Sequence, residues 1–156
     1  MQRRVRLFVF AGVGLIVLLY IVLHLINISA LPVFADEAIY IRWAQLILDD
    51  VQRYWLFALN DGKTPLFVWS IVPALAVLRD QLEAARLVSI GIGLLQVLAM
   101  GWLTSLTVKR KSAILWSMLL TTVLPIWFFY HRMALMDGLL TLWFTLALGM
   151  ILWFAK

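Results

Sequence analysis

Apolar residues gather in four long segments, separated by polar connections. The segments cover residues 7–26, 87–108, 113–130 and 139–155. A helix rises about 1.5 Å per residue, so segments of this length can cross a hydrocarbon core of about 30 Å. The pattern predicts an all-α integral membrane protein with four transmembrane helices.

A fifth apolar segment, residues 66–78, is shorter than the other four and contains Pro73. Apolar stretches of about 10–14 residues are more often interfacial or re-entrant than spanning. Pro65 suits the first position of a helix. We therefore expect a juxtamembrane helix over residues 65–78.

The polar loop before it predicts another juxtamembrane helix, over residues 36–50. Ile39, Trp43 and Ile47 recur at helical spacing and form an apolar stripe together with Leu46. Such a helix can lie in the membrane interface. A cleaved signal peptide is the alternative interpretation of the preceding residues, because residues 33–35 resemble a cleavage site. Both interpretations place Asp36 outside the cytoplasm.

Composition agrees with a membrane location. The chain is 65% hydrophobic and 13% charged, whereas soluble domains are about half apolar and about a quarter charged. It contains no cysteine, which excludes disulfides, thiol catalysis and cysteine metal sites. The net charge of +5 is explained better by membrane topology than by a nucleic-acid partner.

Two acid-free cationic clusters define the expected topology. Arg3, Arg4 and Arg6 form one cluster and residues 109–111 form the other. Both should be cytoplasmic by the positive-inside rule, so an even number of crossings separates them and residues 66–78 do not cross. We expect a multi-pass protein of the plasma (inner) membrane with a cytoplasmic N-terminus. All eight carboxylates then lie outside: Asp36, Glu37, Asp49, Asp50, Asp61, Asp80, Glu83 and Asp137.

The acid pair Asp36-Glu37 is the leading candidate for chemistry. Adjacent carboxylates repel each other, and partial burial disfavours their charged forms. One of them can serve as a general base or bind a divalent cation through oxygen. The alternative is an N-terminal helix cap that complements the helix dipole. The pattern alone leaves both interpretations open.

Three cations border the apolar segments and can bind a phosphate. Lys63 follows Gly62, Arg86 precedes the second span, and Arg132 follows the third. Lysine binds phosphate as a point charge and arginine as a bidentate donor. Alternatively, Lys63 snorkels at the membrane boundary and the two arginines anchor the ends of spans.

Asp137 lies at the start of the last apolar segment. An ionisable residue there is a functional candidate, and helix capping is the alternative. His24 interrupts the first segment and His131 follows the third, each without a partner motif. A zinc site requires more ligands at defined spacing, so these histidines do not predict one.

The ordered set of motifs resembles a family of membrane enzymes. A basic start and one span are followed by Asp36-Glu37-Ala38-Ile39-Tyr40, by the turn Gly62-Lys63-Thr64-Pro65-Leu66, by Ala85-Arg86-Leu87 and by Arg132-Met133-Ala134-Leu135-Met136-Asp137. This order resembles the N-terminal module of the C-type (GT-C fold) integral membrane glycosyltransferases. Similar members are the dolichyl-phosphate-mannose protein O-mannosyltransferases, the aminoarabinose transferase of lipid A and bacterial Rgt-type relatives.

The resemblance implies transfer of a sugar from a polyprenyl-phosphate donor to a lipid, glycan or protein acceptor at the extracytoplasmic face. Asp36 would be the catalytic carboxylate, with Glu37 beside it. Asp36 and Asp137 would hold a divalent cation, Mg²⁺ or Mn²⁺, if the reaction uses one. Members of the family have further spans, so this chain would be the N-terminal part of a larger enzyme.

The resemblance also implies a set of substrate-binding residues, which are Lys63, Arg86, Arg132 and Tyr40. The family's Lys-Pro-Pro-Leu turn becomes residues 63–66 here, with one proline replaced by Thr64. A noncatalytic membrane subunit for lipid binding or assembly is the alternative function. It would use the same cations to hold an anionic lipid and would not need Asp36.

Overall fold

The computed structural model describes the backbone of residues 2–155 and the side chains of residues 7–155, so the side chains of Arg3, Arg4 and Arg6 lie outside the described part. Within that range the chain is helical and has no strand, which confirms the all-α prediction. The elements are α1 (Gln2–Leu25), α2 (Ala35–Asp49), α3 (Val51–Tyr54), the 3-10 helix η1 (Phe57–Asp61), α4 (Leu66–Val77), α5 (Gln81–Thr107), α6 (Lys111–Val123), α7 (Pro125–Arg132) and α8 (Met136–Phe154).

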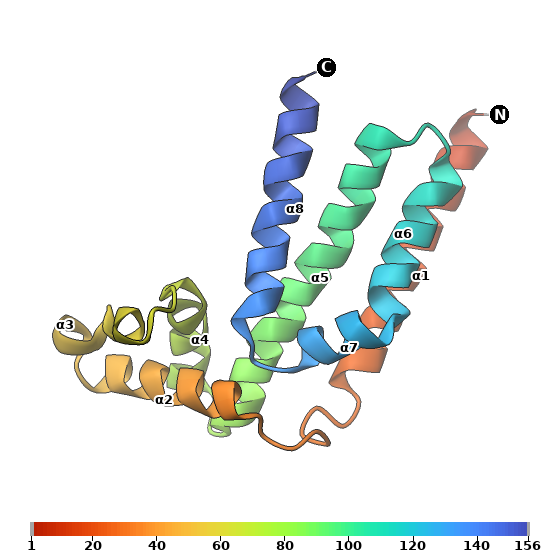
Figure 1. Ribbon diagram of the computed structural model, residues 1–156. Coiled ribbons are helices and arrows are strands. Elements are labelled where there is room, and N and C mark those ends of the chain that lie inside the picture. Colours follow the sequence, from red (N-terminus) through yellow and green to blue (C-terminus); the bar gives the residue numbers. More distant parts are fainter. Residues whose placement is uncertain (1, 156) are drawn as a thin grey trace.

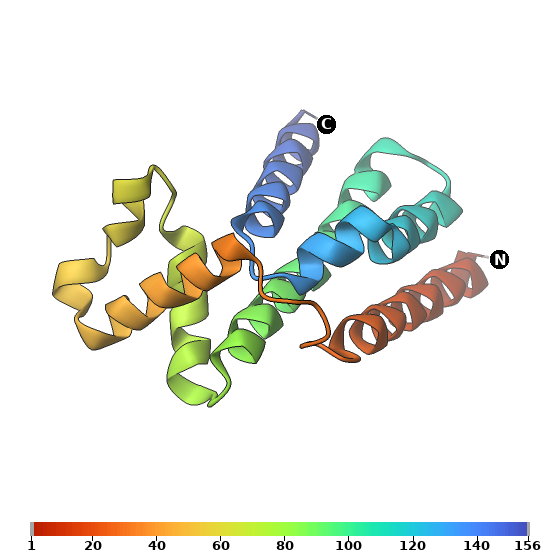
Figure 2. The same cartoon turned by 60° about the horizontal axis from the view of Figure 1, so that its bottom comes forward.

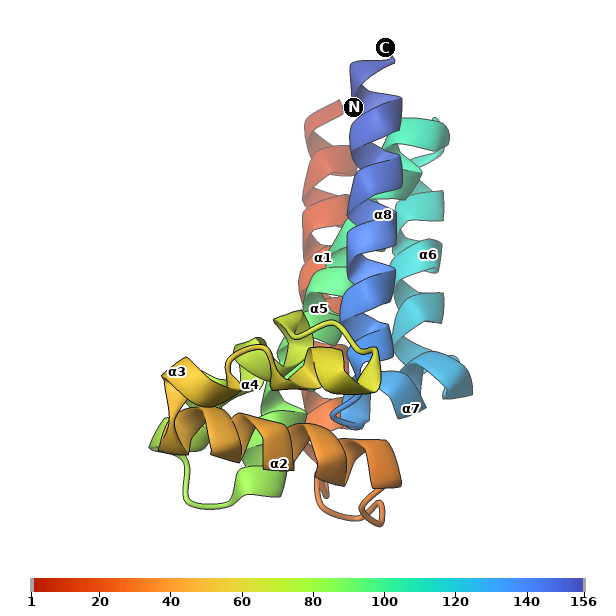
Figure 3. The same cartoon turned by 60° about the vertical axis from the view of Figure 1, so that its left-hand side comes forward.

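The long helices α1, α5, α6 and α8 run side by side and form a bundle (Figure 1). The two chain ends and the α5–α6 connection lie at one end of this bundle. Helices α2, α3 and α4 gather beside its opposite end, which we call the loop end (Figures 2 and 3). The residues of the acid-rich loop and the connection before α8 are therefore at the same end of the molecule.

In the described part of the chain, three helices are long and apolar enough to cross a membrane: Leu7–Leu25, Gln81–Thr107 and Met136–Phe154. A fourth crossing exists if α6 and α7 count together, but this pair is bent by 62°. The bend divides the span predicted over residues 113–130. Pro125 begins α7, and the residue before it, Leu124, has an extended backbone. Proline disfavours the helical conformation of the preceding residue, which explains where α6 ends.

The short apolar segment forms α4, a helix of 12 residues. This helix is shorter than the roughly 20 residues that a spanning helix needs. It packs against α2 and α5 at the loop end. Its bounds agree with the short helix expected over residues 65–78, and its location at the membrane surface stays a prediction.

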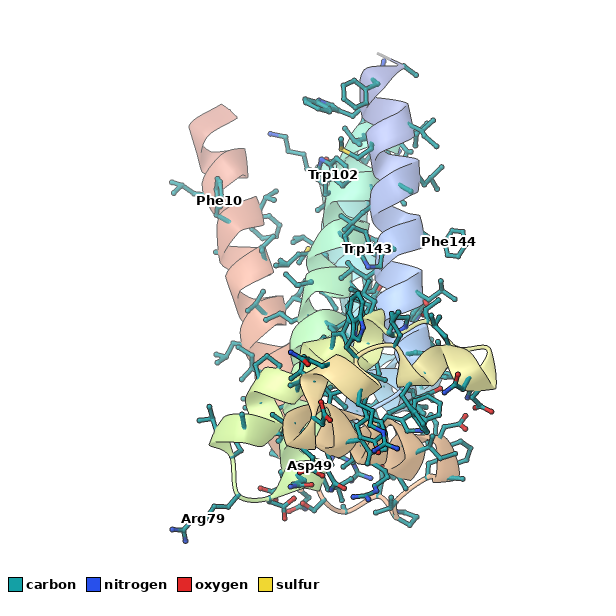
Figure 4. The ribbon with its side chains drawn as sticks, turned by 90° about the vertical axis from the view of Figure 1, so that its left-hand side faces the viewer. Phe10, Asp49, Arg79, Trp102, Trp143 and Phe144 are labelled. Atoms are coloured by element: carbon teal, nitrogen blue, oxygen red, sulfur yellow. The ribbon has the colours of Figure 1, made fainter. Side chains whose placement is uncertain are left out.

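The surface of the bundle is apolar between its two ends. Phe10 and Phe144 are 76% and 68% exposed and project away from the bundle on opposite sides (Figure 4). Asp49 and Arg79 lie at the loop end in the same view. An outward-facing apolar belt with charged residues at the ends is the arrangement that a bilayer requires.

Helix α5 is central and contacts α4, α6, α7 and α8. Small residues allow the closest approaches. A Cβ atom at Gly149 of α8 would lie 2.2 Å from the ring of Trp102, and one at Gly101 would lie 2.8 Å from Met118. Glycine at such crossings lets helices pack closely in membranes, where the hydrophobic effect does not drive them together.

Candidate functional site

Helix α2 carries the first candidate residues and packs on α4. Its buried face includes Tyr40, Ala44 and Ile47, and the Tyr40 ring meets Phe67 of α4 edge to face at 5.6 Å. The stripe predicted from periodicity is rotated, because Ile39 is 37% exposed. The cause is tertiary packing, because α2 turns the face with Tyr40, Ala44 and Ile47 towards α4.

Lys63 brings two residues of α2 together. Its Nζ atom lies 3.4 Å from Oδ1 of Asp36 and donates a hydrogen bond of 3.0 Å to the Tyr40 hydroxyl. Asp36 and Tyr40 are one helical turn apart, so both can face the same ammonium group. We call Asp36, Tyr40 and Lys63 the Lys63 cluster. Gly62, with φ +69°, ends η1 and turns the chain towards this position.

The Lys63 cluster has perturbed proton affinities. Burial raises the pKa of Tyr40, and the nearby carboxylates of Asp36 and Asp137 raise it further, while Lys63 opposes both effects. The hydrogen bond to Tyr40 is the main reason that the pKa of Lys63 is raised. At neutral pH the cluster therefore contains a neutral phenol and a charged ammonium group.

Met136 also contacts this cluster, and the sequence did not predict that contact. The Tyr40 hydroxyl donates to its Sδ atom at 3.1 Å. Met136 is the first residue of α8, so this contact joins α2 to the start of the last helix. A thioether is only a weak acceptor, and no sequence motif could have indicated the pairing.

Glu37 has a different environment from its neighbour Asp36. Its carboxylate and the Arg86 guanidinium form two hydrogen bonds of 2.8 Å, and both side chains are 0% exposed. The backbone N–H groups of Phe34 and Ala134 donate to the same carboxylate, at 3.3 and 2.9 Å. Both oxygens of Glu37 are therefore occupied. The catalytic role predicted for Glu37 stays a prediction, and the geometry favours a positioning role.

Arg86 is fully engaged by protein groups. Besides Glu37, it donates to the carbonyl oxygens of Ile28 and Pro32, at 2.8 and 3.3 Å. The guanidinium thus connects α5 to the chain between α1 and α2 and to the start of α2. A substrate phosphate has no direct access to it in this structure.

Arg132 closes the end of α1. Its guanidinium donates to the carbonyl oxygens of Leu23, Ile26 and Asn27 and lies 5.0 Å from the centre of the Phe128 ring. Carbonyl groups at a helix C-terminus lack helical partners and carry partial negative charge, so a cation there is stabilising. The residue predicted to bind phosphate serves as a helix cap in this structure.

Asp137 is exposed in the first turn of α8 and lines a pocket of about 280 Å³ between α7 and α8. Trp127, Tyr130 and Thr141 are also part of the lining. Because Asp137 and Asp36 both act electrostatically on Tyr40, the loop end brings two carboxylates to one region.

This donor set fits a divalent cation only together with a substrate. Among residues 7–155 no group of three or more His, Cys, Asp or Glu side chains could hold a metal ion. Mg²⁺ is often bound by one or two carboxylates plus substrate phosphates. Asp36 and Asp137 would meet that requirement, and the divalent cation stays a prediction.

Comparison of the chain with protein families, with characterised proteins and with solved structures found no match. The functional interpretation therefore rests on the geometry of the loop end and on the chemistry of its residues.

Proposed function

We propose that this chain is a module of a membrane glycosyltransferase that uses a polyprenyl-phosphate sugar. The supporting observation is the Lys63 cluster, where an ammonium group lies between a carboxylate and a phenol. The side chains of Lys63 and Asp36 are 26% and 41% exposed. A phosphate and an acceptor hydroxyl can therefore reach them from outside the bundle.

The proposed topology has four crossings, with α6 and α7 forming one bent span. The N-terminus and residues 109–111 lie in the cytoplasm, and the loop end lies at the extracytoplasmic face. Helix α4 then remains in the outer interface. The positive-inside rule supports this orientation, because the compact basic cluster at residues 109–111 is at the end of the bundle opposite the acid-rich loop.

Cysteine labelling tests this topology directly, because the chain has no native cysteine. Asp61, Asp137 and Lys109 are all exposed. We expect Asp61→Cys and Asp137→Cys to react with an impermeant maleimide from the outside of intact cells. Lys109→Cys should react only after the membrane is permeabilised. Labelling of positions 61 and 137 from opposite sides would overturn the shared site.

In the proposed reaction, the bond between the sugar carbon and the donor phosphate breaks while the acceptor oxygen bonds to that carbon. Asp36 accepts the proton of the acceptor hydroxyl, and the polyprenyl phosphate leaves with the bonding electron pair. The ammonium group of Lys63 stabilises the charge that develops on this phosphate. A phosphate at Lys63 also competes with Asp36 for the ammonium group, which frees the carboxylate to act as a base.

The remaining residues position these groups. Glu37 and Arg86 fix the start of α2, and Arg132 fixes the end of α1. If a divalent cation takes part, Asp36 and Asp137 would hold it, and it would supply further stabilisation of negative charge. Tyr40 would orient Lys63 through its hydroxyl group.

A second candidate function is a noncatalytic lipid-binding subunit. One observation favours it: an apolar pocket of about 320 Å³ at the loop end. The stacked rings of Trp55 and Trp69, 5.7 Å apart, form part of its wall, and Val72 and Pro73 extend it along α4. Such a pocket accommodates an acyl or prenyl chain without any catalytic carboxylate.

The two functions are separated by Asp36→Asn and Lys63→Ala in the full-length protein. Transfer would be measured with polyprenyl-phosphate mannose and polyprenyl-phosphate aminoarabinose, and binding with polyprenyl phosphate alone. For the enzyme, Asp36→Asn should lower transfer by about 100-fold or more and leave binding intact. Asp49→Asn is the matched control, because Asp49 is an exposed carboxylate of the same helix.

Unchanged transfer in Asp36→Asn would remove the catalytic interpretation. A wild-type protein that binds polyprenyl phosphate through Lys63 and transfers neither sugar would instead be the lipid-binding subunit. Loss of binding in Lys63→Ala, with Arg79→Ala unchanged, is expected for both functions. Retained binding in Lys63→Ala would contradict both.

A further inference from the structure

The only two histidines of the chain meet inside the bundle. His24 lies in α1 and His131 in α7, and their ring centres are 5.9 Å apart. They are 0% and 1% exposed. The two histidines are far apart in the sequence and neither has a partner motif nearby, so the sequence did not predict that they meet. Polar groups inside a membrane bundle are costly, so a buried pair invites a functional explanation.

Three of the four imidazole nitrogens have no hydrogen-bond partner in the protein. These are Nε2 of His24 and both Nδ1 and Nε2 of His131. Nδ1 of His24 lies 2.9 Å from the carbonyl oxygen of Tyr20. A carbonyl only accepts, so Nδ1 carries the proton and Nε2 keeps its lone pair. Metal-binding histidines usually donate their second nitrogen to a carbonyl or carboxylate in this way.

Neighbouring residues hold both rings in place. Tyr20 stacks on His24 with ring centres 3.9 Å apart and donates its hydroxyl to the Ile90 carbonyl at 2.9 Å. Gly93 of α5 leaves the space that this arrangement needs. A Cβ atom there would lie 2.2 Å from the Tyr20 hydroxyl and 2.5 Å from Cγ of His131. The pair is therefore pre-organised by Tyr20, from the same helix as His24, and by Gly93 of α5.

We propose that His24 and His131 bind a single copper(I) ion between α1 and α7. Metal–nitrogen bonds of about 2.0 Å, with about 1.1 Å from nitrogen to ring centre, separate two nearly collinear imidazoles on one ion by about 6 Å. The observed separation is 5.9 Å. Copper is among the metals that imidazole ligands suit, and its monovalent form accepts two ligands in a linear arrangement.

The ligand set excludes the common alternatives. Mg²⁺ and Ca²⁺ require oxygen ligands, and structural zinc requires four ligands. No carboxylate hydrogen-bonds to either histidine in the described part of the chain. The charge of Arg132 acts electrostatically on His24. A monovalent ion is repelled less by this guanidinium than a divalent one, and it is less costly to desolvate.

This copper site does not depend on glycosyl transfer. The bound ion would join the first span to the helix that precedes α8, and binding to the folded state alone stabilises it. Aromatic residues surround the pair, since Phe128 and Trp127 lie 5.0 and 5.6 Å from the rings of His24 and His131. They keep water away from the ion.

Copper(I) binding to the full chain in detergent tests the proposal. The protein would carry no histidine tag and would compete under anaerobic, reducing conditions with a chromophoric copper(I) chelator. We expect about one ion per chain in the wild type and its loss in His24→Ala and in His131→Ala. Gly93→Ala should lower the affinity by about 10-fold or more, because it displaces His131.

Methionine sulfur also binds copper(I), so Met150→Leu serves as a control. Met150 is 41% exposed, and this variant should retain the ion. If the histidine variants do not fold, X-ray absorption of the wild-type complex decides, with two nitrogen neighbours and imidazole scattering expected. Sulfur neighbours, the absence of stoichiometric copper, or equal retention in a folded double histidine variant would each overturn the proposal.

Discussion

Two ion pairs begin at adjacent residues of α2, yet they have opposite environments. Glu37 and Arg86 are both fully buried, with two hydrogen bonds of 2.8 Å. Asp36 and Lys63 are partly exposed and 3.4 Å apart. The buried pair is further bonded to the backbone of Phe34 and Ala134, whereas Lys63 shares its ammonium group with a phenol.

This difference separates two roles that adjacent acidic residues can have. A buried, fully bonded carboxylate stabilises one arrangement of the chain, because removing its partner leaves an uncompensated charge. A long, partly exposed pair contributes little to stability and can exchange its partner for a substrate. The loop end thus contains one ion pair that holds the fold and one that is available for chemistry.

The largest expected effect is on folding. Glu37→Ala should destabilise the protein by about 3–5 kcal/mol, because the Arg86 guanidinium then stays buried without a counter-ion. Chemical denaturation in detergent, followed by circular dichroism, measures this change. Asp49→Ala is the control. If the two variants unfold at similar denaturant concentrations, the Glu37–Arg86 pair does not stabilise the fold of the loop end.

A charge-conserving exchange tests whether the geometry of each ion pair matters in addition to its charge. Arg86→Lys keeps the charge but loses the planar donor set, which leaves acceptors of Glu37, Ile28 or Pro32 unsatisfied. We expect a loss of about 1–3 kcal/mol. The reverse exchange in the exposed pair, Lys63→Arg, should change stability by less than about 1 kcal/mol. Equal effects of the two exchanges would mean that geometry matters no more in one pair than in the other.

The smallest expected effect concerns alkaline pH. The pKa values of Tyr40 and Lys63 are both raised, so the folded protein keeps these protons at a higher pH than the unfolded chain. Their stabilisation is complete below about pH 10 and is lost as pH rises further. Tyr40→Phe should reduce the alkaline decrease in Tm by about 2 °C. Identical decreases in wild type and Tyr40→Phe would contradict this coupling.

Much of the helical framework was predictable from the sequence because it depends on local composition. Long apolar segments predicted the long helices, and the short segment with Pro73 predicted α4. Pro125 indicated a kink, but a bend of 62° depends on how α7 packs against α5 and α8, which the local pattern does not contain. Likewise, periodicity identified α2 but not the face that it turns towards α4.

The site was less predictable, because its residues differ through tertiary partners. Asp36 and Glu37 have similar side chains and adjacent positions, and their partners distinguish them: Lys63 for Asp36, and Arg86 and Ala134 for Glu37. Arg132 looked like a phosphate ligand, whereas its donors meet the end of α1. Lys63 and Tyr40 were expected at one site, and they do meet. His24 and His131 had no local signal at all.

The hydrogen bond from Ala134 to Glu37 also bears on biosynthesis. The ribosome synthesises the chain from its N-terminus, so the residues around Glu37 are made before α5, α6 and α7. Its partner Arg86 is made later than Glu37, and its last donor is made only with the connection before α8. The residues around Glu37 are therefore made early but reach their final structure late, and a translation arrest before residue 134 would leave Glu37 without the Ala134 donor.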